Sequence, residues 1–391
     1  MSGWFQESHN LRYAQLDGID LSQAIFQNAW LDHADFSSSM LGHANLSYTN
    51  LTGANLSGVN LSSAVMFSST LTDANLAGAV VTATNLSGTT SRGLTADQFY
   101  ATQSYAAKNL YGIGLGDNDL TAWDLSGQNL TNANFSGSTL TDANLAKSNL
   151  ASAFMWGCDL TGVNLSEASL AGAHVSDTNL VGADLTGANL TSANLSRSVL
   201  IDASFTMALV VGTELTETSS RGFTATQLYA TQSYASKDLH GIGLASNDLT
   251  AWDFSGQNLT NADFSGSTLT DANLTRANLS RARLSSKLAG ADLTGAVVRG
   301  TDLAGTTSQG FTAAQFYSTQ SYVEKDLQGI QLSYNDLAGW DLSGQNLSSA
   351  DLRYATFRGV NLAGANLNTA NLESAVDLEL VAATFSPFGD L

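Results

Sequence analysis

An apolar residue recurs at every fifth position over most of this chain. The segment LTGANLSGVNLSSAVM places Leu51, Leu56, Leu61 and Met66 at this spacing. A period of five matches neither the 3.6-residue period of an α-helix nor the two-residue period of a strand. The sequence therefore indicates a short repeated unit that is neither a helix nor an ordinary strand.

The five-residue frame has a consistent composition. Its 62 apolar positions are all Leu, Phe, Met or Val. The residue two places earlier is usually small, the residue between is mostly Asn or Asp, and the next two are mostly Ser, Thr, Gly or Ala. Apolar residues two positions apart point to one side of an extended chain, and the polar residues favour turns. The unit therefore reads Ala-(Asn/Asp)-Leu-x-x, with one buried side and a turn.

This unit resembles the repeat of the pentapeptide-repeat family, over about four fifths of the chain. The resemblance implies an all-β fold, a right-handed quadrilateral parallel β-helix, or β-solenoid, with four units in each coil. Neighbouring coils would then bond to one another at a spacing of about 4.8 Å. The frame positions predict about 15 such coils, with the leucines stacked as a continuous core.

Three interruptions of the frame predict three short helical inserts. Residues 89–145 and 218–274 are identical at 46 of 57 aligned positions, and a third copy begins at Thr306. Thr95 and Gln98 have the spacing of a helix capping box, and aromatic residues follow. We expect each insert to be one helix of two to three turns that replaces one side of a coil or bulges from a corner.

These patterns predict an alternation of coils and inserts along the chain. The predicted segments are an N-terminal cap at 1–10, pentapeptide coils at 11–88, 110–217, 239–305 and 327–375, helical inserts at 89–109, 218–238 and 306–326, and a C-terminal cap or dimer segment at 376–391.

The units that follow each insert carry bulky or polar residues at the usually small position. In the first copy these are Lys108, Ile113, Asn118, Trp123 and Gln128. Such side chains do not fit a narrow wall, so the cross-section must widen where the insert packs. We interpret the tryptophans of the three copies, Trp123, Trp252 and Trp340, as filling that space. Stacking on a ligand is the alternative.

The sequence contains no recognisable catalytic, cofactor or metal site. No nucleophile has an adjacent base, and no glycine-rich phosphate loop opens a helix. His33 and His43 are ten residues apart, which would place them on opposite sides of a four-unit coil. The single cysteine, Cys158, excludes an internal disulfide framework. We therefore predict that the protein is not an enzyme.

Three groups of residues are candidate interaction surfaces. Phe154 and Trp156 flank an inward Met, and Val199 and Ile201 flank an inward Leu in the same way. Outward apolar residues favour a contact patch, or alternatively a place beneath an insert helix. A basic cluster near a one-residue slip of the frame comprises Arg276, Arg281, Arg283, Lys287 and Arg299. We interpret it as a solvated band or a partner contact. Phe385 and Phe388 in the last stretch indicate a cap or a dimer surface.

The charge balance limits the possible partners. The net charge of −19 disfavours direct binding to nucleic acid. No apolar run approaches about 18 residues, so no membrane span is predicted. The first residues lack the pattern of a signal peptide. We expect a cytoplasmic protein, with export as the alternative if a signal peptide has been removed.

A scaffold for protein partners is the function that these observations favour. We predict a rigid β-solenoid rod whose partner the sequence does not identify, with a homodimer formed through one end as a further possibility. An exported surface rod is one alternative. The other is an acidic DNA mimic that binds a type II topoisomerase, because some members of the similar family resemble duplex DNA and bind gyrase.

Overall fold

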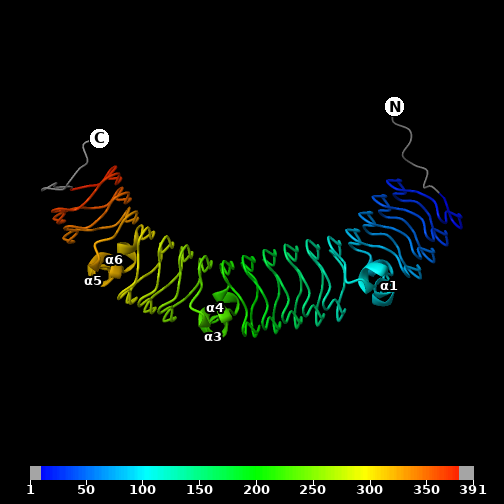
Figure 1. Cartoon of the computed structure of the whole chain (residues 1–391), viewed down its shortest axis with the longest axis horizontal. Helices are drawn as coiled ribbons and strands as arrows, with labels where there is room; N and C mark the ends of the chain where they lie inside the picture. Colours follow the sequence, from blue (N-terminus) through cyan, green and yellow to red (C-terminus); the bar gives the residue numbers. More distant parts are fainter. Residues whose placement is uncertain (1–9, 378–391) are drawn as a thin grey trace, which may run out of the picture. The chain divides into compact units, whose positions relative to one another are not determined.

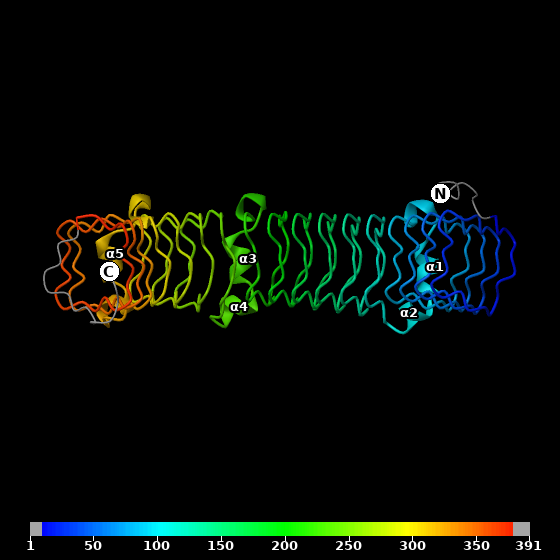
Figure 2. The ribbon, with the colours of Figure 1, turned by 90° about the horizontal axis from the view of Figure 1, so that it is seen from above.

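The computed structural model describes residues 10–377, in which the pentapeptides wind into regular coils of four units each. Asn10 therefore bridges in parallel to Trp30 on the next coil, and Gln15 bridges to Asp35. The chain divides into two compact units, Met1–Ala208 and Leu209–Leu391, called unit 1 and unit 2 below. Figures 1 and 2 show the coils of each unit lying side by side.

The coils are joined by single bridged residues rather than by the expected strands. Within residues 10–377 each pentapeptide contributes one bridged residue, followed by the apolar residue and two turn residues. The backbone N–H of Leu31 donates to the oxygen of Asn50 at 2.8 Å, and the N–H of Asn50 donates to that of Ala29 at 3.0 Å. The ladder between coils is therefore present, but a turn in every unit keeps any strand from extending.

Asparagine and aspartate fix the turns of the coil. The Oδ1 atom of Asn50 accepts a hydrogen bond from the backbone N–H of Thr52 at 3.1 Å, and this pattern recurs in many units. Such a bond stabilises the turn, which explains why the bridged position favours these residues. Inside the turn, the apolar residue and the small residue two places earlier, for example Leu56 and Ala54, are fully buried.

Each insert consists of a 3₁₀ turn and two short helices, not of one helix. The first insert contains η1 (Thr90–Arg92), α1 (Ala96–Tyr100) and α2 (Gln103–Ala106). The second contains η2 (Ser219–Arg221), α3 (Ala225–Tyr229) and α4 (Gln232–Ala235), and the third contains η3 (Thr306–Gln309), α5 (Ala313–Tyr317) and α6 (Gln320–Val323). The capping box of Thr95 and Gln98 is present. Thr102 then caps α2 by accepting from the N–H of Tyr105, and this second cap divides the expected helix.

The first insert replaces two sides of a coil, where one side or a bulge was expected. The N–H of Leu71 donates to the oxygen of Arg92, and the N–H of Gly78 donates to that of Ala101. The coil closes only where Asn85 bridges to Gly114, so it contains more residues than a regular coil. The coils that contain the other two inserts are longer by the same amount, because Glu214 bridges to Gly243 and Asp302 bridges to Gln331.

Unit 2 keeps one register through the slip of the frame. The step from Thr268 to its bridge partner Lys287 is a single residue shorter than in a regular coil, and Ser286 is buried at the shortened turn. One column of bridges therefore continues from Glu214 to Gln331. As a consequence the helices α3–α4 and α5–α6 lie along the same edge of unit 2 (Figure 1).

Candidate interaction sites

The tryptophan of each copy lies in an aromatic cluster under its insert. Trp123 is 7% exposed, and its ring centroid is 5.3 Å from that of Phe99 and 5.9 Å from that of Tyr100. The equivalent contacts are those of Trp252 with Phe223 and Tyr229, and those of Trp340 with Phe311, Phe316 and Tyr317. The indoles thus pack between the insert and the following coil.

The other replaced wall positions do not all point inward. Ile113, Asn118 and Gln128 are buried like the tryptophan. Lys108 is exposed, because it follows α2 with a left-handed backbone, φ 53°, before the pentapeptide frame resumes. The cross-section therefore changes at four of the five positions, and the lysine belongs to the end of the insert.

Tyrosines fasten each insert to the next coil. The backbone N–H of Asp124 donates to the hydroxyl of Tyr100 at 2.6 Å, and the hydroxyl of Tyr105 donates to the oxygen of Asp124 at 2.9 Å. Partial burial raises the pKa of both phenols, and in the second insert it raises the pKa of Tyr234 to about 12. These hydroxyls stay protonated near neutral pH, as a structural hydrogen bond requires.

The predicted apolar surface residues of unit 1 fall on two separate columns of bridges. Phe154 and Trp156 are 47% and 59% exposed, and Phe154 stacks on His174 with centroids 5.0 Å apart. Ile201 is exposed and Val199 is half-buried. Phe154 bridges to His174, whereas Val199 bridges to Asn179 in another column, so the two pairs do not form one column. Phe385 and Phe388 lie outside the described residues.

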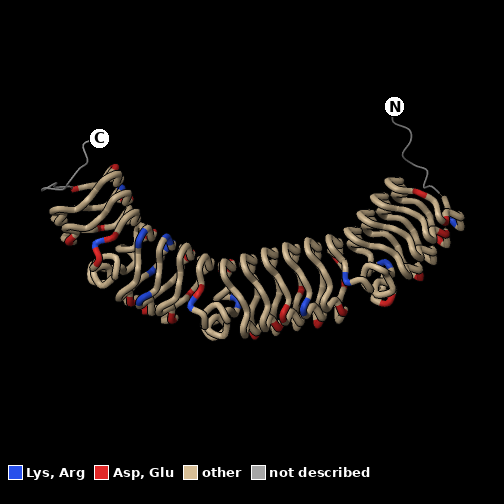
Figure 3. Tube along the Cα trace, in the orientation of Figure 1, with Lys and Arg blue, Asp and Glu red and all other residues tan. Residues whose placement is uncertain are grey.

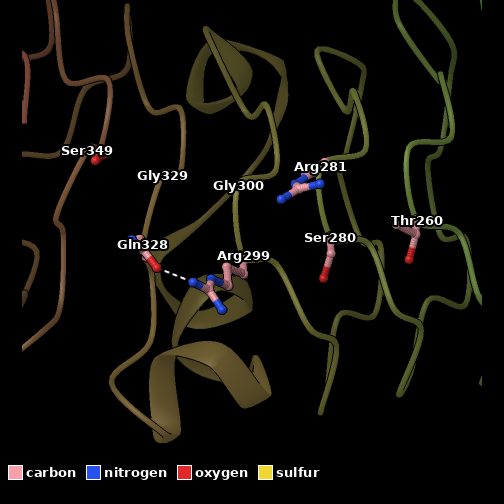
Figure 4. A pocket seen from close by; sticks show the side chains of 8 residues that line it. All are labelled: Thr260, Ser280, Arg281, Arg299, Gly300, Gln328, Gly329 and Ser349. Atoms are coloured by element: carbon pink, nitrogen blue, oxygen red, sulfur yellow. Dashed lines mark hydrogen bonds between the residues drawn. The ribbon is translucent and has the colours of Figure 1, made fainter.

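A groove beside the frame slip of unit 2 contains part of the predicted basic cluster (Figure 4). It has a volume of about 550 Å³ and crosses the turns that follow equivalent units of successive coils. Its lining consists of Thr260, Ser280, Arg281, Arg299, Gly300, Gln328, Gly329 and Ser349. We call it the basic groove. Figure 3 shows several Lys and Arg positions in the same stretch, between α4 and α5.

The two arginines of the basic groove lie on neighbouring coils but differ in their partners. The N–H of Arg281 donates to the backbone oxygen of Arg299 at 3.0 Å. The guanidinium of Arg299 donates to Gln328 and lies 3.8 Å from a carboxylate oxygen of Asp326. No carboxylate in the described part of the chain pairs with Arg281, which is exposed. Arg281 is therefore free to bind an external anion.

A glycine makes room for the side chain of Arg281. Gly300 has φ +67°, and a Cβ atom on it would lie 3.3 Å from Cγ of Arg281. The stem of the arginine thus packs over the bare turn of the next coil. Arg283, the other arginine predicted as a contact residue, lies outside the groove and pairs with Asp263 at 3.1 Å.

Residues 10–377 offer no clear site for chemistry. No group of three His, Cys, Asp or Glu residues in this range is arranged to hold a metal ion. No helix of the described chain has the length and apolar character to cross a membrane. Burial raises the pKa of Cys158 to about 12, and its thiol donates to the backbone oxygen of Phe135. This cysteine is thus a packed residue.

Comparison with known proteins finds one matching family model, described as pentapeptide repeats, with eight copies. The matched residues are 10–37, 40–82, 119–157, 144–180, 158–197, 178–216, 248–285, 326–362 and 350–376. A search of curated proteins gave no match.

Several solved structures are similar over part of their length. HetL of the cyanobacterium Nostoc, which is involved in heterocyst differentiation regulation, is 24% identical over 75% of this chain and 89% of its own, with a TM-score of 0.20. A protein from the Arabidopsis thaliana thylakoid lumen is 38% identical over 23% of this chain and 67% of its own, TM-score 0.21. The fluoroquinolone resistance protein QnrB1 is 16% identical over 61% and 92%, TM-score 0.29. At these TM-scores the likenesses do not indicate the function of this chain.

Proposed function

Because the chain belongs to the pentapeptide-repeat family, we propose that it is a non-enzymatic scaffold that binds an acidic segment of a protein partner in the basic groove. Members of this family fold as right-handed quadrilateral β-helices, and we infer that hand for this chain. Its coils hold exposed side chains at a fixed spacing, which suits the recognition of an extended partner.

The observation that carries this proposal is the free guanidinium of Arg281 in an acidic protein. The chain has 34 acidic and only 15 basic Lys and Arg residues, yet no described carboxylate pairs with Arg281. Arg299 lies on the next coil in the same groove. A carboxylate of the partner would bond to such a guanidinium through two parallel hydrogen bonds. The negative charge elsewhere on the chain would repel the partner from other surfaces.

The basic groove also separates this proposal from the alternatives. A mimic of duplex DNA needs surfaces that present negative charge, whereas the groove presents two arginines. DNA gyrase supercoiling measured with increasing protein tests the mimic, and inhibition at micromolar protein would support it. An exported rod would be detected outside the cytosolic fraction of cells that produce the natural protein. A homodimer formed through the C-terminal segment involves residues outside the described range.

Binding of a fluorescent hexaglutamate peptide at low ionic strength tests the scaffold proposal. We expect the variant Arg281→Gln to weaken binding about tenfold, because it removes a charge-assisted pair of hydrogen bonds. The matched control is Arg358→Gln, which changes the net charge equally at an exposed arginine outside the groove. Equal weakening by both variants would show general charge attraction and contradict the proposed groove.

A further inference from the structure

A second hollow in unit 2 lies beside the third insert and shares no residue with the basic groove. It has a volume of about 570 Å³ and lies where the turn after Gly305 approaches two later coils. The lining residues that matter here are Phe311, Tyr334, Asp336, Trp340, Tyr354 and Thr356. We call it the tyrosine hollow.

Two stacked tyrosines form one side of the tyrosine hollow. Tyr334 and Tyr354 occupy equivalent turn positions on successive coils, with ring centroids 4.8 Å apart and planes at 10°. They are 63% and 46% exposed, so their rings remain accessible to a ligand. Phe311 and Trp340, in contact at 5.9 Å, are buried and give the hollow an aromatic floor. The hollow thus combines accessible rings with an apolar base.

The only charged side chain that lines the tyrosine hollow is the carboxylate of Asp336. Its Oδ1 atom accepts from the backbone N–H of Ala338 at 3.1 Å, which leaves Oδ2 available. The neighbouring guanidinium of Arg353 is held by Asp351 through two hydrogen bonds of 2.8 Å. No Lys or Arg lines the hollow. Its electrostatics therefore favour a positively charged ligand.

The other two copies show that the fold does not need these tyrosines. The equivalents of Tyr334 and Tyr354 are Asp117 and Gly137 in the first copy, and Ser246 and Gly266 in the second. Those copies keep the tryptophan and the aspartate, which pack the insert and stabilise the turn. The tyrosine pair is thus an addition specific to the third copy, and packing of the insert does not account for it.

We propose that the tyrosine hollow binds an organic cation, specifically a quaternary or alkylated ammonium group. Ring faces attract such cations through the aromatic quadrupole, most strongly where the cation is partly desolvated. The carboxylate of Asp336 supplies the opposite charge. The net charge of −19 raises the concentration of cations near the surface. Anionic ligands are disfavoured by the same charges.

Choline binding to the full-length protein, measured by calorimetry, tests the proposal. The matched ligand is 3,3-dimethylbutan-1-ol, which has nearly the same shape but no charge. We expect choline to bind at least about tenfold more tightly, because only choline gains from the ring quadrupoles and the carboxylate. Equal binding of the two ligands would mean an apolar hollow without cation recognition and would overturn the proposal.

Substitutions taken from the second copy locate the site without disturbing the fold. The double variant Tyr334→Ser with Tyr354→Gly carries the residues of that copy, and we expect it to lose choline binding. Asp336→Asn keeps the Oδ1 acceptor for the turn and removes the charge, so binding should weaken about tenfold. Tyr13→Ser, at an exposed stacked tyrosine of unit 1, should leave binding unchanged. Unchanged binding in the double variant, or preference for glucose over choline, would overturn the proposal.

Discussion

Asn118 accepts a hydrogen bond from the backbone N–H of Thr89, on the preceding coil, at 2.9 Å. The same oxygen accepts from the N–H of Thr90, while the amide nitrogen donates to the backbone oxygens of Leu86 and Leu115 at 3.0 Å. Asn247 and Asn335 bind the second and third inserts in a similar way. One buried amide thus fixes the point where the chain leaves the coil.

Removal of this amide should destabilise the first insert. The variant Asn118→Ala leaves two backbone N–H groups and two carbonyl groups without their partner at a buried position. We expect a loss of about 3 kcal/mol or more in the free energy of unfolding, because each unpaired buried group costs about 1–3 kcal/mol. Urea unfolding followed by circular dichroism measures the loss. Hydrogen exchange at Thr89 and Thr90 locates it.

The control for this prediction is Asn75→Ala. Asn75 is exposed and accepts one turn hydrogen bond from the N–H of Ala77. Its replacement should cost about 1 kcal/mol or less, since water replaces the lost partner. A comparable loss in both variants would show that the four buried bonds of Asn118 are not exceptional.

The coil could be predicted from the sequence because its period appears in nearly every residue. The path of the inserts could not, since the spacing from Leu86 to Leu110 shows how many residues are added but not which sides they replace. The division of the expected helix depends on Thr102, whose side chain caps α2 in competition with a continuous helix.

The sites depended on details that the repeat pattern does not contain. The sequence indicated a basic cluster, but only the coil shows that Arg281 lines a groove while Arg283 pairs with Asp263. A shortened turn separates the relevant arginines, so their spacing differs from that of equivalent residues in regular coils. The signal for Tyr334 and Tyr354 was present, because they occupy the same place in their units, one regular coil apart. Stacking on the next coil follows from that spacing.

Glycine should stabilise turns that now carry alanine. Ala122 and Ala251 have φ of 59° and 60°, and the third copy has glycine, Gly339, at the equivalent position with φ 73°. A left-handed conformation costs an L-residue about 1–2 kcal/mol, and glycine loses about 0.5–1 kcal/mol more on folding. Ala122→Gly should therefore stabilise unit 1 by about 0.5–1 kcal/mol, measured as a higher urea midpoint.

The reciprocal variant provides the control for the glycine prediction. Nothing lies within 4 Å of a Cβ atom placed on Gly339, so Gly339→Ala changes only the backbone preference. It should destabilise unit 2 by a similar amount. A shift of both variants in the same direction would contradict the prediction.

The protein should lose stability in acid because of its turn aspartates. The hydroxyl and backbone N–H of Thr121 donate to Asp119 and lower its pKa, and Thr250 and Ser343 lower those of Asp248 and Asp341. A carboxyl whose pKa is lower in the folded state stabilises the fold above its unfolded pKa of about 3.9. That contribution disappears as the pH falls through the folded pKa. Urea midpoints between pH 6 and pH 2 measure the decline.

Asparagine variants test the acid prediction site by site. Asp119→Asn keeps the Oδ1 acceptor of the turn but has no charge to titrate. We expect this variant to show a slightly smaller decline with acid than the natural protein, and the combined variant of all three aspartates to show a clearly smaller one. An identical decline in the combined variant would assign acid sensitivity to other groups.

Cys158 should be almost unreactive until its coil opens. Burial raises its pKa from 9.0 to about 12, so at pH 8 its thiolate fraction falls about a thousandfold, and the thiolate is the reactive form. It is the only cysteine, so labelling with a chromogenic disulfide reports this position alone. We expect labelling to be at least about a thousandfold slower than in denaturant. Ser192→Cys in a Cys158→Ser background places a thiol on an exposed turn and should react at the rate of a free thiol. Rapid labelling of native Cys158 would instead mean that the coils around it open frequently, which is inconsistent with a rigid scaffold.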